Sequence, residues 1–90
     1  MDESLAQSHD MLRAFLHAEL QLVPTLLGAA HKSLFLGESK AAFQAMHHVD
    51  EALDMVERFA GELPAEERSV ILQSVAEHRA NMKVIRRLAS

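Results

Sequence analysis

The sequence predicts an all-α protein, an antiparallel three-helix bundle that forms a single domain over residues 1–90. Apolar residues recur every three or four positions along most of the chain, which is the period of one face of an α-helix. No window alternates apolar and polar residues for long, as a half-buried strand would. Gly37 and Gly61 are each followed within three residues by signals for a new helix. Two such short connections predict three helices, each antiparallel to the next.

The first helix is expected over residues 4–36, with the hydroxyl of Ser4 and the side chain of Gln7 as a reciprocal cap. Its apolar stripe keeps the same phase across Pro24, although proline removes one backbone hydrogen bond and clashes with the preceding turn. We therefore expect one helix kinked at Pro24; a break there would give a four-helix bundle. The stripe comprises Leu5, His9, Leu12, Leu16, Leu20, Val23, Leu27, Ala30 and Leu34.

The second and third helices are expected over residues 39–60 and 64–89. The second has the most regular apolar seam, with spacings of four, three, four, three and four residues, which is typical of coiled-coil-like packing. This seam, which we expect to form the core, comprises Ala42, Met46, Val49, Leu53, Val56 and Ala60. Pro64 suits the first turn of the third helix. The stripe of that helix comprises Ile71, Val75, His78, Met82, Ile85 and Ala89.

Residues 20–36 are unusual because, as a helix, they are apolar on two faces. The stripe occupies one face, and Leu22, Leu26 and Ala29 occupy the other. One neighbouring layer cannot cover both faces, so the second face needs another partner unless this helix lies at the centre of the bundle. A domain this small has a small core and gains stability from an added interface. We therefore expect Leu22, Leu26 and Ala29 to bind a protein partner or a second copy of the chain.

Composition restricts the compartment and the partners. A formal net charge of −4 makes nucleic acid an unfavourable partner. The chain has no cysteine, which excludes disulfides and thiolate metal sites and fits a reducing compartment. The first residues are acidic where an export signal is basic, and the apolar runs are shorter than the roughly 20 residues of a membrane span. We expect a cytoplasmic protein with no membrane contact.

Two blocks of opposite charge lie far apart in the sequence. The acidic block comprises Asp50, Glu51, Asp54 and Glu57, and the basic block comprises Arg79, Lys83, Arg86 and Arg87. We expect the blocks to face each other across antiparallel helices, and the basic block also suits the negative end of the last helix dipole. A phosphate-binding basic tail is the alternative.

Motifs for catalysis and for metal binding are missing from the sequence. His47, Glu51 and Asp54 share one helical face, as metal ligands could. However, the chain contains neither Glu-x-x-His nor His-Glu-x-x-His, so we interpret this trio as a solvated polar face. Gly-x-Ser-x-Gly, Ser-x-x-Lys and a phosphate-binding glycine loop are also absent. We expect no catalytic residue, no metal site, no cofactor and no enzymatic activity.

Two histidines leave alternatives open. His78 occupies a position on the apolar stripe, where a histidine is usually hydrogen-bonded to a neighbour at the edge of the core. It could instead fix the helix register or make the packing sensitive to pH. His31, followed by Lys32, resembles the phosphorylatable histidine of histidine phosphotransfer domains, but Leu34 stands where those domains are expected to have a lysine. A phosphotransfer-like signalling module is therefore an alternative function.

The last third of the chain, from Glu62-Leu63-Pro64 through the segment EHRANMKVIRRL at residues 77–88, resembles the long helix of small bacterial export chaperones of the flagellar FliT-like kind. Those chaperones are cytoplasmic helical hairpins and bundles that hold secretion substrates through exposed apolar helix faces. The resemblance implies a non-enzymatic protein-binding module, an adaptor or chaperone-like regulator, and transfers no role to an individual residue. A plain structural homodimer is the other alternative.

Overall fold

The fold consists of three helices, as the sequence predicts. A computed structural model describes residues 3–89, and the side chains of residues 9–89. Helix α1 spans Glu3–Phe35, α2 spans Ser39–Ala60 and α3 spans Ala65–Ala89, with no strand among the described residues. The all-α class is confirmed, and the helix bounds agree with the predicted ranges to within one residue. The predicted cap at Ser4 lies outside the described side chains.

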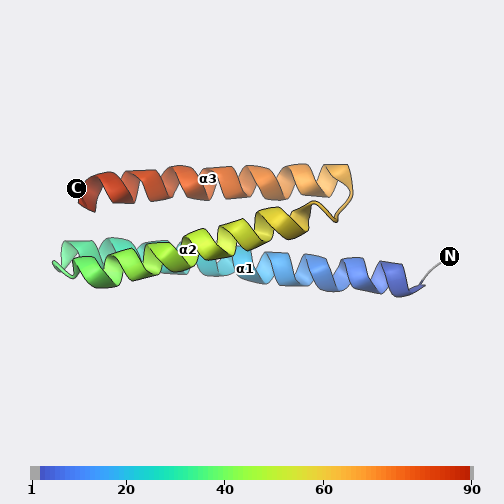
Figure 1. The fold of residues 1–90 in the computed structure, drawn as a ribbon, viewed down its shortest axis with the longest axis horizontal. Coiled ribbons are helices and arrows are strands. Elements are labelled where there is room, and N and C mark those ends of the chain that lie inside the picture. Colours follow the sequence, from blue (N-terminus) through green and yellow to red (C-terminus); the bar gives the residue numbers. More distant parts are fainter. Residues whose placement is uncertain (1–2, 90) are drawn as a thin grey trace.

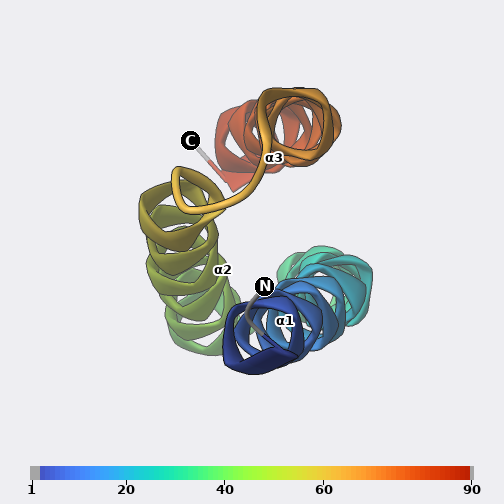
Figure 2. The same ribbon diagram turned by 90° about the vertical axis from the view of Figure 1, so that its right-hand side faces the viewer.

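Helix α2 is the centre of the bundle. Consecutive helices are antiparallel, so α1 and α3 run in the same direction on either side of it (Figure 1). In the end-on view, α1 and α3 both lie beside α2 (Figure 2). The two outer helices also touch each other, since Arg13 Nε of α1 lies 2.7 Å from Glu67 Oε1 of α3. Each outer helix still packs mainly against α2, and the molecule is elongated, with extents of 55 × 18 × 14 Å. One face of α1 and one side of α3 are therefore left without a neighbouring helix.

The predicted seam of α2 is the core. All six of its residues are buried, and Val49 and Leu53 are completely so. They pack with the buried stripe residues of the outer helices, which are Leu16, Val23, Leu27 and Ala30 of α1 and Ile71, Val75, Met82 and Ile85 of α3. Leu63, in the α2–α3 connection, is also buried. Side chains from both sides of α2 thus share one core, as expected when a heptad-like seam lies between two layers.

Helix α1 continues through Pro24 without a break. Proline cannot donate to the carbonyl of Leu20, yet the flanking stripe residues Val23 and Leu27 are both buried, so packing against α2 holds the helix on each side. The four-helix alternative does not occur.

Gly37 and Gly61 follow the ends of α1 and α2 in different backbone conformations. Gly37 has a φ of 78°, and the N–H of Gly37 and of Glu38 donate to the carbonyls of Leu34 and Ser33 at 3.0 and 2.7 Å. This is a Schellman motif, in which a left-handed residue satisfies the last carbonyls of the helix. Gly61 instead keeps right-handed backbone angles, so the α2–α3 connection does not need the freedom of glycine there.

The charge blocks meet across α2 and α3, which confirms the predicted pairing. The Arg79 guanidinium lies 2.8 Å from a carboxylate oxygen of Asp54 and 3.0 Å from one of Glu57, and Arg86 lies 2.5 Å from Asp50. The hydrogen bond to Asp54 raises the pKa of Arg79 above its ordinary value despite partial desolvation. These contacts fix the side of α2 that α3 covers.

Candidate functional site

The three residues predicted to bind a partner do not share one environment. Leu22 is 52% exposed and Ala29 is also exposed, as expected for a face that the chain's own core leaves open. Leu26 is partly buried and packs against the core. The second face of α1 is therefore open at Leu22 and Ala29, whereas Leu26 also supports the fold.

Leu22 and Leu26 line a hollow of about 300 Å³ between α1 and α2. On the α2 side, its apolar lining is Ala52 and Met55, and no residue of α3 contributes. The carboxylates of α2 that bind α3, such as Asp54 and Glu57, lie on another side of the same helix. The hollow is thus on the surface of the bundle that faces away from α3.

Exposed apolar side chains continue from this hollow toward the start of α1. Met11 and Phe15 precede Leu22 at helical spacing, which places all three on one side of α1. Met11 is 73% exposed, and Phe15 makes an edge-to-face contact with Phe59 of α2 at a centroid distance of 6.3 Å. We call the surface formed by these side chains the α1–α2 face, and define it as Met11, Phe15, Leu22, Leu26, Ala29 and Met55.

The polar residues around the hollow are mainly acidic. Glu19 and Glu51 line it together with His48, and neither lysine nor arginine is among the lining residues. Glu51 pairs with His47 at 2.7 Å. Glu19 is partly buried and has no ion pair with any described residue. The hollow therefore combines an apolar floor with a carboxylate that no described cation neutralises by direct contact.

A second opening lies between the C-terminal halves of α1 and α3. A hollow of about 490 Å³ is lined by Pro24 and Gly28 of α1 and by His78 of α3, among other residues. His78 is partly buried, and its Nδ1 atom has no hydrogen-bond partner among the described residues, so the hydrogen bond expected for this histidine is not formed at Nδ1. His31 is exposed and lines a smaller adjoining hollow of about 220 Å³.

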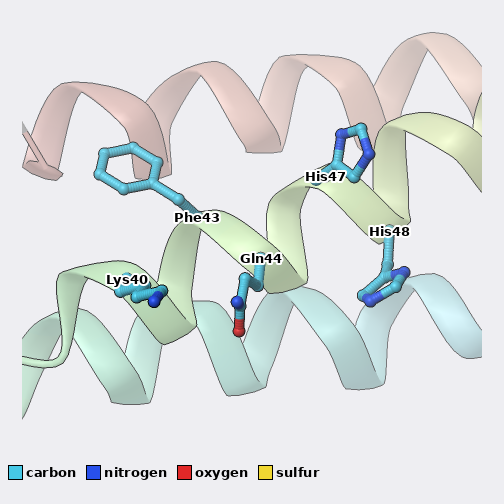
Figure 3. Close-up of a pocket in the computed structure, with 5 residues that line it drawn as sticks. All are labelled: Lys40, Phe43, Gln44, His47 and His48. Atoms are coloured by element: carbon cyan, nitrogen blue, oxygen red, sulfur yellow. The ribbon is translucent and has the colours of Figure 1, made fainter.

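The histidines of α2 line one shallow hollow but do not form a metal site with the described carboxylates. A shallow hollow of about 720 Å³ is lined by Lys40, Phe43, Gln44, His47 and His48, all from α2. Figure 3 shows His47 and His48 on neighbouring positions of α2, and their ring centroids lie 6.4 Å apart. In the predicted trio, His47 pairs with Glu51, whereas Asp54 pairs with Arg79. Within the described part of the chain, no group of three or more histidine and carboxylate side chains is placed to hold a metal ion.

Comparisons with protein-family models, with curated protein sequences and with solved structures found no match to this chain. Among the described residues, none of the helices combines the length and the apolar character that crossing a membrane requires. The geometry of the α1–α2 face is therefore the main guide to function.

Proposed function

We propose that this protein is a non-enzymatic protein-binding module that uses the α1–α2 face to bury an apolar segment of a partner. One observation carries the proposal: large apolar side chains recur along one side of α1, interrupted there by Glu19, and three of them, Met11, Phe15 and Leu22, are at least 39% exposed. Isolated exposed apolar residues are common on soluble proteins, but several of them on one side of a helix, beside a hollow, are typical of a binding surface.

The energetics favour association at this face. Full burial of a leucine or methionine side chain is worth about 1.5–3 kcal/mol, so covering the exposed half of Leu22 would contribute roughly 1 kcal/mol. Met11 has more area to lose, since 73% of it is exposed. The bundle leaves the side of α1 that carries Leu22 without a neighbouring helix, and a partner helix would supply the missing layer.

An adaptor or chaperone-like regulator of the cytoplasm is the role that fits these features best. The resemblance of residues 62–88 to FliT-like export chaperones supports it, because such proteins hold their substrates through exposed apolar helix faces. In this role the face would shield an aggregation-prone segment until the segment is released.

Capture of partners by paired variants tests the proposal. Leu22→Asp places a charge in the centre of the face, and Val70→Asp places one at a 68% exposed position of α3 that lines none of the hollows described above. We expect wild type and Val70→Asp to capture the same proteins from the source organism, or to form the same oligomer, and Leu22→Asp to lose them. Equal capture by both variants would place the binding surface elsewhere.

A further inference from the structure

We propose that the occupant of the α1–α2 face is an amphipathic helix of another protein whose apolar ridge is flanked by lysine or arginine. This inference rests on the proposed function, because it names the partner class of the same face. Two features lead to it: the shape of the hollow and the sign of the charges around it.

The shape fits a helix. The hollow lies between two antiparallel helices, with Leu22 and Leu26 on one wall and Ala52 and Met55 on the other. A groove between two helices accepts the apolar stripe of a third helix, whose side chains at i, i+3 or i+4, and i+7 enter it as anchors. The small side chain of Ala52 leaves room for one such anchor, and the flexible side chain of Met55 can adapt to it.

The charge selects a basic partner. Glu19 and Glu51 stand beside the apolar floor, and docking would remove water from both carboxylates. Burial of an unpaired carboxylate is costly, whereas a cation on the partner would offset that cost and favour the correct register. Glu19 needs a cation from the partner more than Glu51 does, because Glu19 is already partly buried and has no ion pair among the described residues.

The same charges oppose a second copy as the occupant. In a two-fold dimer the same surface is contributed by both subunits. Such a dimer would bring Glu19 and Glu51 of each copy to one interface, with no lysine or arginine among the residues that line the hollow. Like charges at an interface cost affinity, so the face is better suited to a basic helix than to itself.

Two synthetic helical peptides of about 18 residues, roughly 27 Å long, provide the test. Both carry the same leucine ridge, and the flanking positions are lysine in one and glutamate in the other. Titrations into the 90-residue protein are followed by the methyl NMR signals of Leu22, Leu26 and Met55, which detect binding up to millimolar dissociation constants. The protein variants are Glu19→Lys and, as a control with the same change of charge, Glu77→Lys on α3.

We expect the lysine peptide to shift these methyl signals and to bind wild type about tenfold more tightly than the glutamate peptide, with the difference shrinking as salt is raised. Glu19→Lys should remove or reverse this preference, and Glu77→Lys should preserve it. The lysine peptide could bind no more tightly than the glutamate peptide, while Leu22→Asp weakens the binding of both. This result would refute the proposal of a basic partner and leave the proposed function standing.

Two other outcomes separate the claims further. A homodimer in sedimentation that Leu22→Asp dissociates would show that a second copy occupies the face, which refutes the basic partner but keeps the face as a binding surface. Failure of both peptides to shift the methyl signals of the face at millimolar concentration would count against both proposals.

Discussion

Truncation of Leu53 to alanine should severely destabilise the protein. Leu53 lies at the middle of the α2 seam, is completely buried and belongs to the core that all three helices share. The change deletes three carbons, worth about 0.8 kcal/mol each or roughly 2.4 kcal/mol together. If a cavity of roughly 50–100 Å³ remains, it adds about 1–2 kcal/mol. The expected loss is therefore about 3.4–4.4 kcal/mol, within the usual range of about 2–5 kcal/mol for such truncations.

This loss is large for a 90-residue protein. At about 0.05–0.15 kcal/mol per residue, its total free energy of unfolding is expected to be roughly 5–13 kcal/mol. Urea unfolding followed by far-UV circular dichroism measures the change, and the melting temperature should fall by more than about 10 °C. Leu88→Ala, at a position that is 62% exposed, is the matched control and should cost less than about 1 kcal/mol. If Leu53→Ala melted within a degree of wild type, the seam would not be the core.

Four further changes test individual features of the fold. Gly37→Ala should lower the free energy of unfolding by about 1–2 kcal/mol, because alanine disfavours the left-handed φ of this position. Gly28→Ala should raise it by up to about 1 kcal/mol, because alanine favours the helix and the added methyl has no atom within 4 Å. Equal effects of the two changes in urea unfolding would refute this difference. Arg79→Gln should cost about 1 kcal/mol in low salt and less in high salt, and a loss that does not depend on salt would mean that packing dominates. Pro24→Ala should raise the melting temperature, by the equivalent of about 1–3 kcal/mol, since α1 is continuous there; a lower melting temperature would show that the proline ring is needed for packing.

The sequence is sufficient to predict the three helices and the core of α2. The seam of α2 is regular because this helix lies between α1 and α3, so its buried residues recur every three or four positions along its whole length. The charge blocks were also predictable, since opposite charges at matching helical spacing on consecutive antiparallel helices come together, as Arg79 and Asp54 do. These features depend on local period and on short connections, and both are visible in a single sequence.

The candidate site was predictable only in part. Leu22 and Ala29 are exposed as expected, but Leu26 sits at the edge between the two faces of α1, and the position of α2 decides that it touches the core. Glu19 and Met55 meet in one hollow although 36 positions separate them, and this depends on the register of α1 against α2, which the apolar period does not fix. Met11 and Phe15 could have been found by extending the second face of α1 backwards at helical spacing.

The free energy of unfolding of Leu22→Asp tests the central claim most directly, because the claim is that this face of α1 is a binding surface and not part of the chain's own core. An aspartate at a half-exposed helix position should cost about 1 kcal/mol or less, mainly through lower helix propensity and the small buried part of the side chain. We predict a urea midpoint near that of wild type and an intact helical signal. A loss comparable to that of Leu53→Ala, about 3.4–4.4 kcal/mol, would place Leu22 inside the bundle and contradict the account.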